Sequence, residues 1–351
     1  MTLHDLGFDP WFTAHAPESQ PEGCAIARVC AVDRGSYCLR NESGEVPAEL
    51  SGKLSYQSDR TTDLPSVGDW VTAQYYDNGR AAIIHQVFPR KTYLRRRAAG
   101  GTVDQQMIAA NVDIAFIVQS GHFDFNPNRL ERYLIMAADG QVEPVILLTK
   151  TDLLTEEELK HRLGIIASVT TARIIALSSV TGTGLGELRG ALAPGKTCCL
   201  LGSSGVGKTT LVNRLVGLDA YATRTVSATG EGTHTTTRRQ LIQLESGAML
   251  IDTPGMRELG VLGAADGIDM GFAEMTALAT ACRYADCTHR HEPGCAVRAA
   301  IQRGELQEER YANYVKLRKE SEYFEMSSLD KRKKDKSFGR LVKSVKKGMK
   351  D

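Results

Sequence analysis

A glycine-rich stretch at residues 200–210, here called the phosphate loop, fits the pattern G-x-x-x-x-G-K-[ST] without a mismatch. Glycines in such a loop let backbone N–H groups face a phosphate, the lysine reaches the β- and γ-phosphates, and the following hydroxyl can ligate Mg²⁺. The chain is therefore predicted to bind a nucleoside triphosphate. The predicted nucleotide-binding residues are Gly202, Ser203, Ser204, Gly205, Val206, Gly207, Lys208, Thr209 and Thr210, with Thr209 also on the magnesium ion.

A second phosphate motif, D-x-x-G, begins at Asp252 and ends at Gly255, directly after an apolar run at 248–251. An aspartate there can hold Mg²⁺ through water, and a glycine N–H can meet a γ-phosphate. D-x-x-G alone is a common pattern, but it stands roughly fifty residues after the phosphate loop, where a phosphate-loop NTPase requires it. Asp252 and Gly255 join the predicted nucleotide site, with Asp252 also on the magnesium ion.

Two motifs upstream of the phosphate loop indicate that the base is guanine. The T-K-x-D motif, here called the guanine motif, comprises Thr149, Lys150 and Asp152 and follows an apolar run. A carboxylate such as Asp152 can accept hydrogen bonds from N1–H and the exocyclic amine of guanine, and the Lys150 stem can lie along the ring. Ser178 and Ser179 end the next apolar run and resemble the loop that contacts guanine O6 in GTPases. Each motif alone fits a surface turn; together they predict GTP binding.

The elements that must position these motifs alternate between strand and helix, which implies a doubly wound, mostly parallel α/β sheet with ligands at the carboxyl ends of its strands. The guanine motif precedes the phosphate loop, the reverse of the order in ordinary GTPases, so residues 112–260 are predicted to form a circularly permuted GTPase domain. Strands are predicted over 113–119, 144–148, 173–177, 197–201, 240–244 and 248–251, and helices over 128–139, 156–166 and 185–192.

Residues 22–97 are predicted to form a small closed β-barrel of the OB-fold type, because short strand-like runs alternate with turns rich in Gly, Asn and Asp. Residues 1–21 are expected to be irregular, and 98–111 to be a linker. The barrel offers residues for nucleic-acid binding, although each aromatic among them also suits a core: Trp70, Tyr75, Tyr76, Arg95, Arg96 and Arg97. The predicted strands are 25–32, 36–39, 46–50, 69–76 and 81–88.

Residues 261–330 are predicted to form a helical, metal-binding domain, with a helix over 305–325. Cys282, Cys287, His289 and Cys295 follow the spacing C-x4-C-x-H-x5-C. Three thiolates and one imidazole suit tetrahedral Zn²⁺, and a closed set of four ligands implies one structural ion. His291 is a rival ligand. The remaining cysteines are expected in protein cores: Cys24, Cys30, Cys38, Cys198 and Cys199.

The C-terminal tail, residues 331–351, holds ten lysines and arginines against two aspartates, a net charge of +8. Since the whole chain carries +1, the remainder carries −7. Such a tail favours a polyanionic partner, or is a solvated terminus.

Scattered cysteines in a large chain favour a reducing compartment. The acidic N-terminus does not resemble a secretory signal, and no apolar run has the length of a membrane span. We expect a cytoplasmic protein, a monomer, with no membrane contact.

With this motif order the chain resembles the family of ribosome small-subunit-dependent GTPase A (RsgA/YjeQ/EngC) over nearly its whole length. Residues 106–113 and 128–134 are also similar to that family, as is the C-terminal Cys/His spacing. The resemblance implies an N-terminal OB-fold, a permuted GTPase domain and a C-terminal zinc domain. It also implies Zn²⁺, Mg²⁺ with GTP, and binding to the 30S ribosomal subunit and its 16S rRNA during late maturation.

The same resemblance assigns roles around the first switch, since residues 230–236 are similar to that segment of the family. Thr235 or Thr236 would contact Mg²⁺, and the choice between them stays open. Met256 stands where Ras-like GTPases carry a water-orienting glutamine, so His234 is the candidate catalytic residue; the alternative is an exposed loop histidine. Thr149 replaces the family's usual asparagine, which predicts lower nucleotide affinity with the guanine preference kept by Asp152.

Two alternatives to a 30S-stimulated GTPase stay open on the sequence. One is an RNA-binding GTPase that acts on another RNA, for instance transfer RNA. The other is a nucleotide-sensing scaffold with negligible turnover. Cosedimentation with ribosomes separates the first from the 30S hypothesis, and the effect of His234→Ala on hydrolysis separates the second.

Overall fold

The computed structural model describes residues 2–17, 22–33, 35–58, 60–97, 105–217, 239–252, 268–269 and 271–325. The chain divides into two compact units, Met1–Leu259 and Gly260–Asp351. Among the described residues, no helix combines the length and the apolar composition that a membrane span requires.

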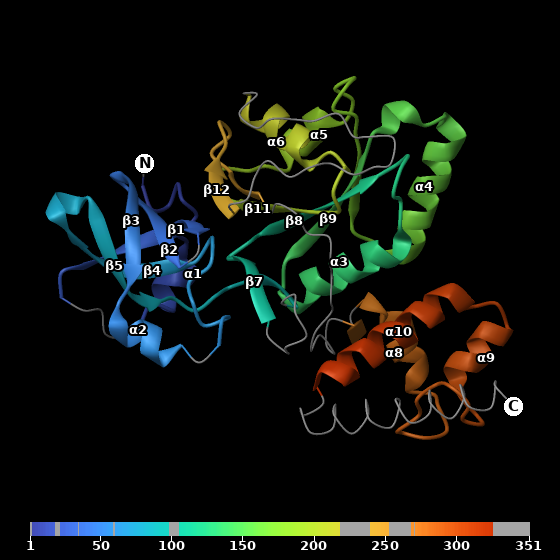
Figure 1. The fold of residues 1–351 in the computed structure, drawn as a ribbon. Coiled ribbons are helices and arrows are strands. Elements are labelled where there is room, and N and C mark those ends of the chain that lie inside the picture. Colours follow the sequence, from blue (N-terminus) through green and yellow to red (C-terminus); the bar gives the residue numbers. More distant parts are fainter. Residues whose placement is uncertain are drawn as a thin grey trace, which may run out of the picture. The chain divides into compact units, whose positions relative to one another are not determined.

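Five strands near the N-terminus close into a barrel, which confirms the predicted OB-like fold (Figure 1). The elements are β1 (Cys24–Asp33), β2 (Ser36–Asn41), β3 (Gly44–Leu50), α2 (Gly52–Gln57), β4 (Trp70–Tyr76) and β5 (Ala81–Val87). β1 pairs antiparallel with β2 and β4, β2 pairs with β3, and β4 pairs with β5; the parallel pairing of β3 with β5 closes the barrel. Its interior is filled by alternating apolar side chains, including Val29, Leu39, Val71 and Ile84.

The N-terminal segment packs against the barrel, and its residues 10–14 form a helix, which corrects the prediction of an irregular segment at that point. Helix α1 (Pro10–Ala14) begins after Asp9, whose carboxylate accepts a hydrogen bond from the Trp11 N–H at 2.9 Å. Leu6 and Phe12 are buried in a hydrophobic core that they share with strand residues of the barrel and the GTPase sheet.

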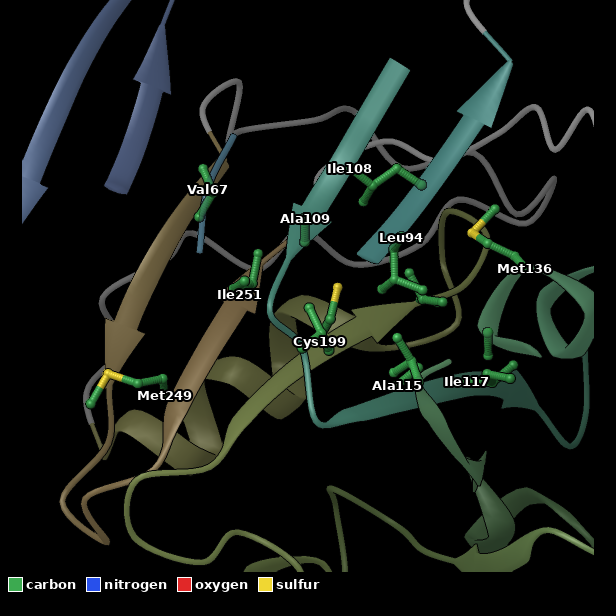
Figure 2. Close-up of a cluster of buried hydrophobic side chains, with 14 of the residues drawn as sticks. Val67, Leu94, Ile108, Ala109, Ala115, Ile117, Met136, Cys199, Met249 and Ile251 are labelled. Atoms are coloured by element: carbon green, nitrogen blue, oxygen red, sulfur yellow. The ribbon is translucent and has the colours of Figure 1, made fainter. Parts of the chain in front are cut away.

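Residues 105–110 form a strand, which corrects the prediction that 98–111 is a linker. β6 (Tyr93–Arg97) and β7 (Gln105–Ala110) make a separate antiparallel pair. Figure 2 shows Leu94 from β6 and Ile108 and Ala109 from β7 gathered with Cys199 and Ile251 of the main sheet. The pair therefore belongs to the core of the first unit.

The residues predicted for nucleic-acid binding differ in their exposure and contacts. Trp70 is fully buried and belongs to the core. Arg95 forms an ion pair with Asp139 at 2.9 Å. Tyr76, in contrast, is exposed.

The predicted α/β sheet is present, with the parallel order β10-β9-β8-β11-β13 and β12 antiparallel to β13 at its end. Its strands are β8 (Ile114–Ser120), β9 (Glu143–Thr149), β10 (Arg173–Ala176), β11 (Thr197–Leu201), β12 (Arg239–Gln243) and β13 (Met249–Asp252). β12 also pairs antiparallel with β1 through Ala31 and Val32. One continuous sheet therefore joins the barrel to the GTPase domain.

Helices cover both faces of this sheet, α3 and α4 on one face and α5 and α6 on the other (Figure 1). They are α3 (Pro127–Asp139), α4 (Glu156–Val169), α5 (Leu185–Gly190) and α6 (Lys208–Val216). The adjacent residues Cys198 and Cys199 on β11 are both fully buried, as predicted, because they point into opposite helix-covered faces. A strand buried on both faces explains the short apolar runs in this part of the sequence.

The second unit contains the helices α8 (Ala273–Ala279), α9 (Ala296–Gln302) and α10 (Glu308–Glu325). Phe272 and Tyr314 meet edge to face with ring centroids 5.4 Å apart, and Val297 and Leu317 are fully buried. The unit is helical, as predicted, and the basic tail at 331–351 lies outside the described residues.

Candidate functional site

The phosphate loop connects the central strand β11 to helix α6 in a shape that requires glycine. A Cβ atom on Gly202 would lie 2.7 Å from the carbonyl oxygen of Val118 on the neighbouring strand. Gly207, with φ of 101°, forms the N-cap of α6. Because the first N–H groups of a helix have no partner within it, this turn presents backbone donors to an anion.

Lys208 lies over the loop that precedes it. Its ammonium donates hydrogen bonds to the carbonyl oxygens of Gly202 and Ser203, both at 2.7 Å. Burial lowers the pKa of Lys208 to about 8, against the attraction of the buried Asp252 carboxylate. A positive charge is thus held inside a cradle of backbone groups, ready to meet phosphate.

Raising the pH from 7 to 9 is expected to weaken nucleotide binding about tenfold, because Lys208 loses its charge above pH 8 and phosphate attracts the charged form. Below pH 7 the lysine is almost fully protonated, so the nucleotide affinity should not change with pH. The measurement is the Kd of a fluorescent GDP analogue across this range. Lys208→Arg, which stays charged throughout, should flatten the profile. Wild-type affinity that does not change between pH 7 and 9 would contradict the prediction.

The guanine motif starts at the end of β9, next to the end of β10. Lys150 adopts the left-handed conformation, with φ of 58°, and burial lowers its pKa against the attraction of Asp152. The Ser178 hydroxyl donates to Asp152 Oδ1 at 2.5 Å and accepts from the N–H groups of Val180 and Thr181. These two donors direct the hydroxyl proton to the carboxylate. Asp152 is therefore fixed in orientation before any base binds.

Thr149 connects the guanine motif to the phosphate loop. Its buried hydroxyl donates to the carbonyl oxygen of Val206 at 2.7 Å and also lies 3.2 Å from the carbonyl oxygen of Gln119. Sequence analysis placed Thr149 in the guanine motif as a substitute for the family's usual asparagine, and did not pair it with the phosphate loop. In the structure this hydroxyl provides a direct bond between the two halves of the site.

Thr149→Val is expected to lower GDP affinity about fivefold, because the buried Val206 carbonyl loses a donor at a net loss of about 1 kcal/mol. Valine keeps the shape of the side chain, so the β9 backbone should stay in place. Thr149→Ser, which retains the hydroxyl, is the matched control and should bind as the wild type does. Isothermal titration of both variants with GDP measures the effect; equal affinity of the valine and serine variants would contradict it.

Asp252 ends β13, which lies beside β11 through the register of Cys199 with Ile251. The buried Asp252 is thus at the same sheet edge as the phosphate loop. The structure brings together the phosphate loop, the guanine motif, Ser178, Ser179 and Asp252. The other predicted residues lie outside the described ranges: Gly255, His234, Thr235 and Thr236.

One residue of this edge escaped sequence analysis. Asp124, in the loop after β8, accepts a hydrogen bond from the Ser203 hydroxyl at 2.6 Å and pairs with Arg129 at 2.7 Å. It thereby holds the phosphate loop from the side of α3. The position of Asp124 could have indicated this role, because it follows a predicted strand, and the carboxyl ends of such strands lie at the ligand-binding edge of the sheet.

The second unit brings the four predicted metal ligands together. The donor atoms of Cys282, Cys287, His289 and Cys295 all lie within 4.8 Å of one another, and the rival His291 is not in this group. His289 Nδ1 lies 3.5 Å from the Sγ atoms of Cys282 and Cys295. Three sulfurs and one imidazole nitrogen at such separations fit a tetrahedral metal ion.

The loop that carries these ligands is shaped by its own hydrogen bonds. Thr288 and the backbone N–H groups at 290 and 291 donate to the Glu292 carboxylate, and these bonds, with the Thr288 hydroxyl first, lower the pKa of Glu292 to about 2. The carbonyl oxygen of His289 accepts from the Tyr311 hydroxyl at 2.6 Å. The His289 backbone is therefore held by α10.

Comparison with known proteins gives one consistent family. A sequence model of the RsgA GTPase family matches residues 87–262. The small ribosomal subunit biogenesis GTPase RsgA of Opitutus terrae is 40% identical over 334 residues, which cover 92% of this chain and 90% of the relative. RsgA 2 of Lactiplantibacillus plantarum, also called a small ribosomal subunit biogenesis GTPase, is 41% identical over 343 residues, 97% of this chain and 96% of the relative.

Solved structures show the same architecture. YjeQ from Thermotoga maritima superimposes with a TM-score of 0.62 at 27% identity, covering 84% of this chain and 97% of YjeQ. YloQ, described as a circularly permuted GTPase, gives a TM-score of 0.60 at 22% identity, covering 89% of this chain and all of YloQ. The permuted order inferred from the motifs thus agrees with the fold.

Proposed function

The chain belongs to the RsgA GTPase family, and on this premise we propose that it hydrolyses GTP to GDP and phosphate on the small (30S) ribosomal subunit during late maturation. The observation that supports a GTP site best is the Thr149–Val206 hydrogen bond, which joins a guanine-type motif to a phosphate loop at one sheet edge. The ribosomal assignment is supported by the names of relatives that match along most of their length.

In the proposed mechanism the phosphate loop and Lys208 bind the β- and γ-phosphates, while Asp152 and Ser178 select guanine. Thr209, Asp252 and either Thr235 or Thr236 would hold Mg²⁺, which when bound neutralises charge that develops on the phosphates. Gly255 would donate its N–H to the γ-phosphate. Met256 has no group that can orient water, so His234 is assigned that role.

The remaining assignments follow the same proposal. Cys282, Cys287, His289 and Cys295 would bind one structural Zn²⁺, which their thiolate-rich set favours over harder ions. The proposed domains are the OB-fold at 22–97, the GTPase domain at 112–260 and the zinc domain at 261–330. We propose a cytoplasmic monomer in which the barrel, the zinc domain and the basic tail contact 16S rRNA.

His234→Ala is expected to lower the rate of GTP hydrolysis about 100-fold, as typically follows loss of a group that positions or activates water. Nucleotide affinity should change little, because the proposed base and phosphate contacts come from the guanine motif and the phosphate loop. Single-turnover hydrolysis and GDP binding measure the two properties separately. His161→Ala, on helix α4, is the matched control. A His234→Ala variant that hydrolyses GTP at the wild-type rate would contradict the mechanism.

The test of the proposed function is GTP turnover by the full chain with and without isolated 30S subunits. Marked stimulation by 30S subunits is the expected result. Turnover that ignores 30S subunits but responds to another RNA would overturn the ribosomal assignment. Tight GTP binding without turnover in either condition would overturn the enzymatic one and favour a scaffold.

A further inference from the structure

A second cluster of metal-ligand side chains lies on strands β1, β2 and β3 of the barrel. The Sγ atoms of Cys30 and Cys38 and a carboxylate oxygen of Glu45, here called the barrel cluster, all lie within 4.8 Å of one another. Sequence analysis placed both cysteines in the core. Cys30 is indeed buried, but Cys38 is half-buried and the Glu45 side chain is 48% exposed. The cluster is thus anchored in the core at one end and open to solvent at the other.

A β-bulge creates this arrangement. Val29 pairs with Leu39 and Ala31 with Cys38, so Cys30 is an extra residue on β1. Its Sγ reaches across to β2, where it donates to the carbonyl oxygen of Cys38 at 3.2 Å. On the other side Cys38 pairs with Pro47 of β3, which places Glu45 two residues along on the same face.

The Glu45 carboxylate is oriented by a second residue. Arg40 forms an ion pair with Glu45 Oε1, while Cys38 Sγ donates to Oε2 at 3.7 Å. One carboxylate oxygen is therefore held by Arg40, and the other faces the Cys38 thiol. Metal-ligating carboxylates are commonly fixed in this way by an outer hydrogen-bond partner.

The spacing also suits a shared ion. With metal–sulfur and metal–oxygen distances near 2.3 and 2.1 Å, a tetrahedral site separates sulfur from oxygen by about 3.6 Å. The observed separation of Cys38 Sγ from Glu45 Oε2 is 3.7 Å. Little movement of the side chains is needed for both donors to reach one ion.

We propose that Cys30, Cys38 and Glu45 bind a thiophilic divalent cation, Zn²⁺ or its analogue Cd²⁺, through two thiolates and one carboxylate oxygen. Each ion that binds displaces the two thiol protons into solvent, and the fourth coordination position is open to water. The site is separate from the Cys/His cluster of the second unit and does not depend on the proposed GTPase function. Arg40 is a positioning residue for it.

Titration of the reduced, metal-free full chain with Cd²⁺ tests the proposal, with thiolate-to-cadmium absorbance in the ultraviolet as the readout. The wild type should bind two ions per chain, one at each cluster, and Cys38→Ser should bind one. Cys24→Ser, a half-buried thiol on the same strand β1, is the matched control and should still bind two. Arg40→Gln leaves all three donors in place and should weaken the second ion roughly tenfold.

One ion per chain in the wild type, or two in Cys38→Ser, would overturn the proposal. A Cys30–Cys38 disulfide found by mass spectrometry in protein kept with a thiol reductant would overturn it as well. If Cys38→Ser fails to fold, the exposed Glu45→Gln takes its place, with an expected loss of affinity for the second ion alone. Unchanged affinity in Glu45→Gln would exclude the carboxylate as a ligand and so overturn the site as proposed.

Discussion

Asp152→Asn is expected to lower the affinity for GTP on the order of 10³-fold and to give the protein a preference for xanthosine triphosphate. In the proposed GTP site, the carboxylate would accept from two N–H groups of guanine, N1–H and the exocyclic amine. An asparagine amide offers one acceptor and one donor group. Xanthine carries an oxygen where guanine carries that amine, so the amide matches xanthine and leaves the guanine amine facing another donor.

The surroundings of Asp152 indicate that asparagine can adopt the same orientation. The Ser178 hydroxyl donates to Oδ1 at 2.5 Å, and its own acceptor sites are filled by the backbone N–H groups of Val180 and Thr181. An asparagine Oδ1 can accept that same bond, which turns its NH₂ group toward the base. The fold and the phosphate contacts should therefore survive the change.

Competition between fluorescent GDP and xanthosine diphosphate analogues measures this reversal. Asp124→Asn is the control: it is the same chemical change in a residue that contacts Ser203 of the phosphate loop and Arg129 and not the guanine motif, so it should keep the preference for guanine. Asp152→Asn that still prefers GDP would show that another residue reads the base.

The site could be predicted in large part from sequence because its motifs are local. Backbone N–H groups supply much of a phosphate site, so the glycines and Lys208 mark it within a single loop. The flanking strands are short apolar runs because both faces of the sheet are covered. For this reason the bounds of β11, 197–201, could be predicted from sequence. Parallel strands then bring their carboxyl ends to one edge, and the motifs with them.

What escaped sequence analysis depends on distant partners. β7 has no pattern of its own and is a strand because it pairs with β6 and buries Ile108. The N-terminal segment is ordered by Arg28, fully buried, which donates to the carbonyl oxygens of Leu6, Gly68 and Asn111. Three segments far apart in the chain meet at one guanidinium, and no local pattern encodes such a meeting.

Sequence also assigned roles to residues whose pairing only coordinates reveal. Thr149 was judged by its type, as a weaker asparagine, and its bond to Val206 could not be seen. Cys30 and Cys38 were judged as core side chains. The β-bulge that shifts Cys30 toward Cys38 could not be predicted from the residue types. Residue type predicts which bonds are possible, and register decides which of them form.

Cys295→Ser is expected to unfold the second unit while leaving GTP binding intact. Cys295 is buried, accepts from the Arg298 N–H at the start of α9 and lies 4.0 Å from Cys282 Sγ, so it caps a helix and, in the proposed site, would also bind the metal ion. A small helical unit buries little apolar surface, and metal binding then supplies on the order of 10 kcal/mol to its folding. Strong chelators should reproduce the loss in the wild-type chain.

Because the chain has two compact units, unfolding of the second unit can be distinguished from a general loss of stability. All described residues of the proposed nucleotide site belong to the first unit. The affinity for GDP should therefore stay at the wild-type value while the helical circular dichroism signal falls. His291→Ala is the matched control, since this histidine lies beside the ligands but outside their group, and it should change neither property. If Cys295→Ser retained the helical signal of the wild type, the ligand set would not be structural. If GDP affinity fell with the helices, the first unit would need the second in order to fold, and the metal would then support the GTP site as well.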